Sequence, residues 1–261
     1  MKIICCIKQV PDTTEVKLDP VTNTLIRDGV PSIINPDDKA GIEAALRLKE
    51  QLGGTVTILS MGPPQADVAI REALAMGADE GILLSDRAFG GADTWATSTT
   101  IAAAIKKMDY DIIITGRQAI DGDTAQVGPQ IAEHLGIPQI SYVKNVELKD
   151  GKLIVTREFE DRVHIIEAPS PVLLTALSEL NDPRYMTVGG IYDAYQKEVK
   201  VWGLKDIEDV VNVADIGLKG SPTKVKKSFT KQAKSAGETF DVDADEAVRI
   251  IMDKLIARHI I

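Results

Sequence analysis

The sequence predicts an α/β fold around a mostly parallel sheet, because apolar strand-like runs alternate with helical patterns over residues 1–135. After Pro138 the pattern changes to a β-meander, and after Asn181 to an extended arm and a final helix. In open parallel sheets, ligands bind beyond the carboxyl ends of the strands. We therefore expect the loops that follow the early strands to build the functional site.

Composition narrows the function classes before any motif is considered. The chain has 261 residues, 44% of them hydrophobic, which is enough for a large core. Its formal charge of −9 argues against nucleic acid or an anionic membrane as the main partner, since both require a basic face. No apolar run reaches the roughly twenty residues that span a bilayer, and no signal peptide is recognisable, so a cytoplasmic protein is predicted.

The cysteines and histidines do not predict a metal site. Two cysteines and three scattered histidines show no metal-ligand spacing. Cys5 and Cys6 are neighbours in a strand-like run, so their side chains should face opposite sides of a sheet and stay reduced.

The N-terminal part predicts a strand, a hairpin and a capped helix. Residues 1–7 fit a buried strand that Pro11 ends, and residues 15–18 and 24–27 fit the two strands of an exposed hairpin. Asn35 then suits the N-cap of a helix whose first turn contains a proline and two acids. A capping motif without any ligand explains the same residues, and this alternative stays open.

The next elements continue the alternation. Residues 55–61 and 80–84 are predicted strands, and residues 65–76 a helix between them. Another helix starts at Asp93, with five Ser or Thr residues between positions 94 and 100. Such a run is typical of a cap with solvated hydroxyls, but it would also suit a phosphate-rich or polar ligand.

The stretch from Gly116 to Ala132 predicts an anion site, because it joins a strand over residues 111–115 to a helix that runs through His134. The first N–H groups of a helix lack intrahelical partners and favour negative charge. Asp123 is the predicted N-cap, and Asp121 a cap or an acceptor for a ribose hydroxyl. Thr124 and Gln126 are predicted to donate to phosphates. An ordinary capped helix remains an alternative.

The second half predicts sheet, then arm, then helix. Predicted strands cover residues 141–148, 152–158, 162–166 and 172–176, the first three forming the meander. We divide the chain into residues 1–182, 183–235 and 236–261: an α/β domain, an extended arm and a C-terminal helix docked on a partner or on the core. The arm contains a lysine-rich stretch, residues 219–234, and the aromatic residues Tyr192, Tyr195 and Trp202, whose exposure would be explained by packing on another chain.

Four motifs, in order along nearly the whole chain, resemble the β (small) subunit of electron transfer flavoproteins. They are Asn35-Pro36, residues 73–79 (ALAMGAD), residues 116–128 (GRQAIDGDTAQVG) and residues 180–185 (LNDPRY). The resemblance implies a Rossmann-like, adenine-nucleotide-binding α/β fold. It also implies a heterodimer with an FAD-carrying α subunit and a recognition arm that docks on acyl-CoA dehydrogenases.

The resemblance also implies site residues. The implied cofactor-binding residues are Cys6, Asn35, Asp38, Met61, Asp93, Thr94, Thr97, Asp121, Gly122, Asp123, Thr124, Ala125, Gln126, Val127 and Gly128. Backbone or van der Waals roles are expected at Cys6, Asp38 and Met61. The implied partner-binding residues are Tyr185, Val188, Ile191 and Tyr192, with Val188 at the position of the apolar anchor. No residue of this chain is expected to act as a catalytic acid or base.

The segment from Gly90 to Ser98 resembles the electron-bifurcating branch of the family. This branch binds a second FAD in the β subunit, which accepts hydride from NADH at flavin N5. One electron then passes to the α-subunit FAD and an acyl-CoA dehydrogenase, and the other to ferredoxin or flavodoxin. The alternative is a non-bifurcating subunit with structural AMP. An adenylating enzyme would need a Ser-Gly-Gly-rich loop after the first strand, where this chain has residues 8–12 (KQVPD).

Overall fold

The computed structural model describes residues 1–12, 31–224, 226 and 237–261. The chain divides into two compact units, residues 1–226 and 227–261. The hairpin predicted over residues 15–27 lies outside the described residues, as does most of the lysine-rich stretch.

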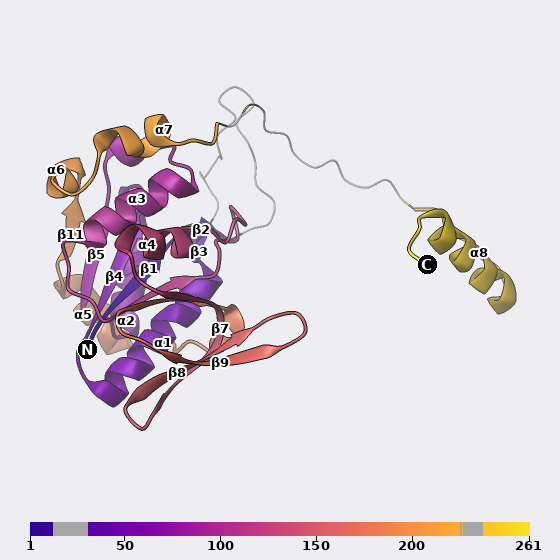
Figure 1. The fold of residues 1–261 in the computed structure, drawn as a ribbon, viewed down its shortest axis with the longest axis horizontal. Coiled ribbons are helices and arrows are strands. Elements are labelled where there is room, and N and C mark those ends of the chain that lie inside the picture. The colour runs from indigo at the N-terminus through magenta and orange to yellow at the C-terminus, as the bar shows by residue number, and fades with distance from the viewer. Residues whose placement is uncertain (13–30, 225, 227–236) are drawn as a thin grey trace. The chain divides into compact units, whose positions relative to one another are not determined.

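The first unit is organised around a nine-stranded sheet in the order β11-β5-β4-β1-β6-β10-β7-β8-β9 (Figure 1). The strands are β1 (Lys2–Ile7), β4 (Thr55–Met61), β5 (Glu80–Leu84), β6 (Ile112–Gly116), β7 (Gln139–Lys149), β8 (Lys152–Glu158), β9 (Val163–Ala168), β10 (Val172–Ala176) and β11 (Val199–Trp202). Neighbours are parallel from β11 to β7, and antiparallel from β7 to β9. The predicted parallel sheet and meander are confirmed.

The chain moves outward from β1 through β4 to β5 and then returns to the other side of β1 with β6. This reversal creates a topological switch point between β1 and β6. Crevices at such points are the usual ligand sites of open α/β sheets.

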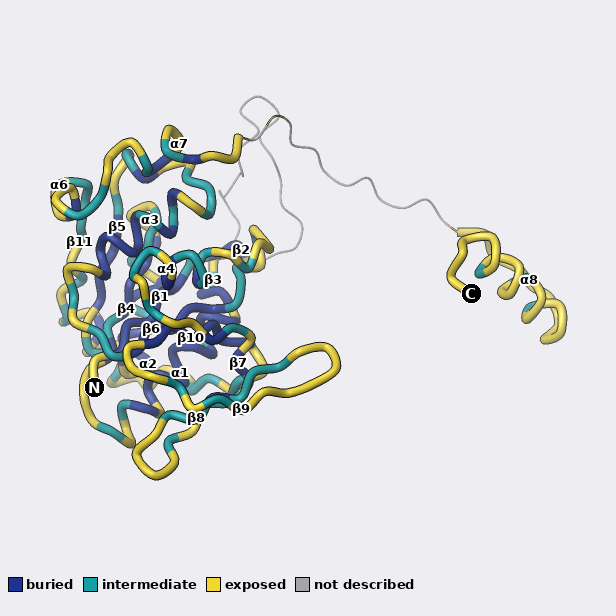
Figure 2. Tube along the Cα trace, viewed as in Figure 1, coloured by how far each residue is buried: buried dark blue, intermediate teal, exposed yellow. Residues whose placement is uncertain are grey.

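Helices cover both faces of the sheet, as a parallel sheet requires. The helices α1 (Pro36–Leu52) and α2 (Asp67–Met76) contribute to one buried core, and α3 (Thr94–Ile105) and α4 (Val127–Leu135) to the other. Cys5 lies in the first core and Cys6 in the second, which confirms that their side chains face opposite sides. Figure 2 shows the central strands buried between these layers.

A small second sheet was not predicted. The strand β2 (Gln9–Pro11) pairs with β3 (Ser32–Ile34) in antiparallel fashion, and Pro11 lies opposite Ser32. β1 ends at Ile7, and Pro11 is instead the last residue of the separate strand β2. The pairing escapes a pattern search because each strand has only three residues and the partner is distant in sequence.

Part of the predicted arm belongs to the first unit. β11 pairs with β5, and the helix α5 (Val188–Gln196) packs against α2. Trp202 is half-buried against the second core, so the prediction that it is exposed was wrong. A four-residue edge strand carries too little periodicity to be recognised. The remaining short elements are α6 (Leu204–Ile207), α7 (Gly217–Gly220), η1 (Pro64–Ala66), η2 (Arg87–Phe89), η3 (Ser178–Leu180) and η4 (Val213–Asp215).

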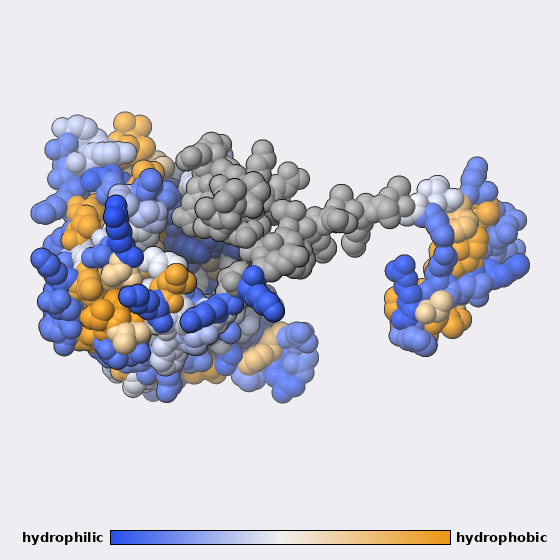
Figure 3. All heavy atoms as spheres, turned by 90° about the horizontal axis from the view of Figure 1, so that it is seen from above, coloured by the Kyte–Doolittle hydropathy of each residue, from blue (hydrophilic) through white to orange (hydrophobic). Residues whose placement is uncertain are grey.

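The second unit contains the helix α8 (Ala244–Ala257), within the segment 236–261 for which a C-terminal helix was predicted. Asp243 caps it by accepting a hydrogen bond from the N–H of Glu246. No residue of α8 is buried, and Val248, Ile251 and Ile256 are exposed. Hydrophobic and hydrophilic side chains share its surface (Figure 3). Among the described residues, no helix is long and apolar enough to cross a membrane.

Candidate functional site

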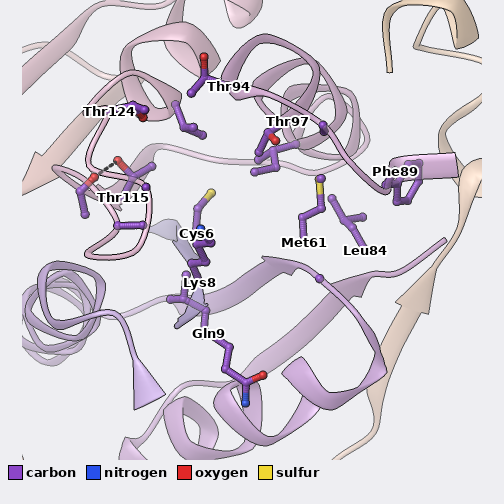
Figure 4. A pocket seen from close by; sticks show the side chains of 18 of the residues that line it. Cys6, Lys8, Gln9, Met61, Leu84, Phe89, Thr94, Thr97, Thr115 and Thr124 are labelled. Atoms are coloured by element: carbon purple, nitrogen blue, oxygen red, sulfur yellow. Dashed lines mark hydrogen bonds between the residues drawn. The ribbon is translucent and has the colours of Figure 1, made fainter. Parts of the chain in front are cut away.

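A cavity of about 820 Å³ lies at the carboxyl ends of β1, β4, β5 and β6 (Figure 4). Its volume is within the range of roughly 300–1,000 Å³ typical of small-molecule sites. Residues 6–9 and 115–119 line it from the two strands that flank the switch point. The sequence-based expectation that the strand-end loops converge is therefore confirmed.

The loop between β6 and α4 forms one wall of the cavity through residues 122–128. α4 begins at Val127 with Gln126 in the N-cap position, and no side chain caps it. The first N–H groups of α4 thus have no capping side chain, which suits an anionic group of a ligand. Thr94 at the start of α3 donates to Oε1 of Gln126 at 3.0 Å, so the starts of α3 and α4 are joined directly in the cavity lining.

The prediction that Asp123 is the N-cap of α4 was wrong. Asp123 has a φ of +55° and accepts a hydrogen bond from the side-chain amide of Gln118. Ala125 is also left-handed, with a φ of +53°. These two residues turn the loop before α4 begins, so Asp123 is separated from the helix. Sequence alone could not distinguish these uses, because aspartate favours both caps and left-handed turns.

The predicted capping role of Asp121 was also wrong. Its two carboxylate oxygens lie 2.6 and 2.8 Å from the Nζ atom of Lys8, and its side chain is only 8% exposed. Asp121 does not line the cavity, whereas Lys8 does. The ion pair therefore holds the loop against the end of β1.

Asn35 occupies the N-cap position of α1, but its side chain does not cap the helix. Its Nδ2 atom donates to the carbonyl oxygen of Gln118 at 2.8 Å, and its Oδ1 atom accepts from the N–H of Ile120 at 3.1 Å. Asn35 is fully buried and lies outside the cavity lining. It thus fixes the ligand-facing loop from behind.

Asp38 joins the ends of the two strands that flank the switch point. Its oxygens accept from the N–H of Lys8 at 2.7 Å and from the N–H of Gly116 at 2.9 Å. Burial raises the pKa of Asp38 to about 7, although these hydrogen bonds oppose the shift. A Cβ atom at position 116 would lie 2.2 Å from Oδ1 of Asp38, so only glycine fits there.

The neighbouring carboxylate, Asp37, holds the end of β10. It accepts from the N–H of Ser178 at 3.0 Å and lies 3.5 Å from Nε of Arg117. Burial raises the pKa of Asp37, and the Arg117 charge opposes that shift. The two acids at the start of α1 are therefore structural acceptors beneath the cavity.

The opposite end of the cavity is apolar. Met61, Leu84 and Phe89 lie together there, with Thr97 nearby (Figure 4). Cys6 also lines the cavity, and burial raises the pKa of its thiol, which therefore stays neutral. The cavity thus combines an anion-binding loop with a wall that can cover an extended aromatic group.

The hydroxyl run of α3 divides into two groups. Thr94 and Thr97 line the cavity, and Thr94 also donates to Oε1 of Gln126, whereas the other three hydroxyl residues do not line it. Ser98 and Thr99 donate to the carbonyl oxygen of Trp95, and Thr100 donates to that of Ala96. Only two of the five hydroxyls are therefore placed to meet a ligand, and Asp93 accounts for the cap by accepting from the N–H of Ala96.

Most of the residues proposed for the cofactor line the cavity. They are Cys6, Asp38, Met61, Asp93, Thr94, Thr97, Gly122, Asp123, Thr124, Ala125, Gln126, Val127 and Gly128. Lining residues that sequence reasoning missed include Lys8, Gln9, Leu84, Arg87, Phe89 and Arg117. Only their position along the chain could have indicated them, because each of these residues ends a predicted strand or follows closely after one. Within the described ranges, no cluster of potential metal ligands occurs.

A separate exposed surface lies on residues 185–192, which we call the docking segment. Tyr185 is 96% exposed and Val188 is 87% exposed, and Ile191 and Tyr192 are also exposed. Exposed aromatic and aliphatic side chains this close together are typical of protein-binding surfaces.

Comparison with known proteins gives matches along the whole chain. The electron transfer flavoprotein domain family matches residues 22–207. The chain is 60% identical to the electron transfer flavoprotein subunit beta of Clostridium acetobutylicum, with 100% of each chain covered. It is 54% identical to the caffeyl-CoA reductase-Etf complex subunit CarD of Acetobacterium woodii, and 47% identical to the acryloyl-CoA reductase electron transfer subunit gamma of Anaerotignum propionicum, again with 100% of each chain covered.

Proposed function

The chain belongs to the electron transfer flavoprotein family as a β subunit, and we propose that its cavity binds FAD and receives electrons from NADH. In this proposal the subunit bifurcates these electrons between the FAD of an α subunit and ferredoxin or flavodoxin. When bound, the flavin would supply acceptance of two electrons and their release one at a time.

The observation that carries the proposal is the joining of two unlike regions in one cavity. The start of α4 and Thr124 suit a phosphate or pyrophosphate, while Met61, Leu84 and Phe89 offer an apolar wall. FAD offers two ring systems joined by a pyrophosphate to a cavity of about 820 Å³, whereas AMP offers a single ring system and one phosphate. Thr94 and Thr97, between the two regions, suit the polar edge of a flavin.

The protein's own part is to bind, orient and exclude water. Asp38 is occupied by two backbone N–H groups, and Cys6 is a neutral thiol. Neither is arranged to transfer a proton to a ligand. The acids of the loop, Asp121 and Asp123, are engaged by Lys8 and Gln118. We therefore propose no catalytic acid or base in this chain.

The proposed partners are an α subunit and an acyl-CoA dehydrogenase. The relatives whose names place them with a caffeyl-CoA reductase and an acryloyl-CoA reductase support a CoA-ester redox enzyme as partner. We propose that residues 1–182 hold the nucleotide, that residues 183–235 serve as the recognition arm, and that residues 236–261 dock on a partner. Tyr185, Val188, Ile191 and Tyr192 would contact the dehydrogenase.

The test is to purify the chain with its α subunit and to measure FAD and AMP per heterodimer. Two FAD per heterodimer, with bleaching of the flavin absorbance by NADH, is the expected result. One FAD plus one AMP would contradict the flavin proposal and indicate the alternative, a non-bifurcating subunit that carries electrons from acyl-CoA dehydrogenases.

A further inference from the structure

The docking segment is exposed, yet the chain is fixed on both sides of it. Before it, the side-chain amide of Asn181 donates to the carbonyl oxygen of Ala40 in α1 at 3.0 Å. After it, Arg71 of α2 donates to the carbonyl oxygen of Ala194 at 2.9 Å. The residues that flank the segment therefore attach it to α1 and α2, and its exposed apolar side chains take no part in these two hydrogen bonds.

The most extensive of these attachments is at Arg184, directly before Tyr185. Its Nε atom donates to Oε2 of Glu43 at 2.8 Å, and its two terminal nitrogens reach Glu50 at 2.5 and 3.2 Å. The backbone N–H of Arg184 also donates to Oε2 of Glu43 at 3.2 Å. Carboxylates of α1 thus accept hydrogen bonds from both the side chain and the backbone N–H of Arg184.

The carboxylate of Glu43 is buried and also bonds to a second arginine. The side chain of Glu43 is 4% exposed, and Arg47 of the same helix occupies its other oxygen at 2.7 Å. Arg47 thus helps to hold the carboxylate of Glu43 in the orientation that Arg184 meets. Charge-assisted, forked hydrogen bonds from a guanidinium define an orientation as well as an attraction.

We propose that Glu43 and Glu50 are positioning residues that hold the docking segment in its partner-binding shape through Arg184. This inference rests on the proposed role of the segment in binding an acyl-CoA dehydrogenase. Residues 188–192 begin α5, which packs against α2, whereas the part of the segment at residues 185–187 lies outside any helix or strand and would otherwise have to be ordered when the partner binds. Pre-ordering it removes that cost from the binding free energy.

The test compares heterodimers carrying Arg184→Lys, which keeps the charge but loses the fork, with the Glu43→Gln, Glu50→Gln double variant. Lys39→Met is the matched control, because Lys39 lies on the same helix but pairs with Glu72 of α2 at 2.7 Å. The probe is a purified short-chain acyl-CoA dehydrogenase. Amide hydrogen exchange of residues 185–192 is measured on the same samples without the dehydrogenase.

We call the contact of Arg184 with Glu43 and Glu50 the clamp. Both clamp variants, Arg184→Lys and the double variant, should raise the KM for the dehydrogenase roughly tenfold. The kcat at saturating dehydrogenase and the flavin content should stay unchanged. Amide exchange of residues 185–192 should become faster, while the control variant should match the wild type. A purely structural role would instead lower flavin content and kcat together, and would overturn the inference. Unchanged KM and exchange would overturn it as well.

Val188→Asp separates this inference from the proposed docking role. If Val188→Asp raises KM and Arg184→Lys does not, the segment docks but the clamp does not position it. If Val188→Asp also leaves KM unchanged, the segment is not the docking surface, and the clamp inference falls with that role.

Discussion

The Nζ atom of Lys8 lies 2.6 Å from a carboxylate oxygen of Asp121 and joins the end of β1 to the loop that precedes α4. Lys8 lines the cavity, and Asp121 belongs to the loop that forms one of the cavity walls without lining it itself. The pair therefore bears directly on how firmly the cavity is held open for a ligand.

Lys8→Met should weaken nucleotide binding by the heterodimer on the order of fivefold to tenfold, because the carboxylate of Asp121 loses its cation. Titration calorimetry with the nucleotide-free heterodimer measures the effect. Lys2→Met is the control, since Lys2 pairs with Asp109 on an exposed surface. Equal affinities in all three proteins would show that the pair does not support the site.

Gly128→Ala should destabilise the protein by about 1–3 kcal/mol. A Cβ atom there would lie 2.6 Å from Oγ1 of Thr115 and 2.9 Å from Cγ2 of Thr175, so α4 would have to move away from the sheet. Gly122→Ala is the control, because no heavy atom beyond its two neighbours in the chain lies within 4 Å of the added methyl group. Urea unfolding compares the two, and equal losses of stability would contradict the packing argument.

Asp38 should make the protein less stable as the pH rises from about 4 to about 7. Burial raises its pKa from 3.8 to about 7, so within this window the folded state binds a proton that the unfolded state has released. Each bound proton contributes a slope of about −1.4 kcal/mol per pH unit to the free energy of unfolding. Above pH 7 this contribution is constant.

Urea unfolding from pH 4 to pH 8 tests this dependence in the wild type and in Asp38→Asn. The variant should show a flatter profile across the window, whatever its absolute stability. Asp37, whose pKa burial also raises, adds to the wild-type slope with the same sign and remains in the variant. Parallel profiles for both proteins would refute the assignment to Asp38.

The double substitution Thr94→Val, Thr97→Val should lower flavin retention in this subunit and spare the flavin of the α subunit, because both hydroxyls line the cavity. Flavin per heterodimer after gel filtration gives the readout. Thr99→Val is the control, since its hydroxyl bonds to the carbonyl oxygen of Trp95 instead. Unchanged flavin content in the double variant would remove these hydroxyls from the site.

The elements that sequence predicted well include strands with a largely apolar run. The strand over residues 55–61 and the strand over residues 80–84 agree residue for residue with β4 and β5. The place of the cavity followed from topology, because parallel strands bring their carboxyl ends to one edge. Neither prediction required knowledge of a side-chain direction.

The errors share a physical origin, because the same polar residue type can either cap a helix or form hydrogen bonds with a distant part of the chain. Asn35 and Asp123 fit helix caps by composition, yet Asn35 bridges Gln118 and Ile120, and Asp123 meets Gln118. Long-range contacts decide between such uses. The short strands β2, β3 and β11 were missed for a related reason, since pairing across the fold stabilises them more than their own sequence does.

The grip of α1 on Arg184 limits how partner preference can be transplanted between related proteins. Glu43 and Glu50 lie 141 and 134 positions before Arg184 in the chain, far outside any contiguous exchange of residues 183–197. A chimera that receives only that stretch would inherit the exposed side chains without the carboxylates that orient them. Exchanging specificity therefore requires two distant pieces of sequence to travel together.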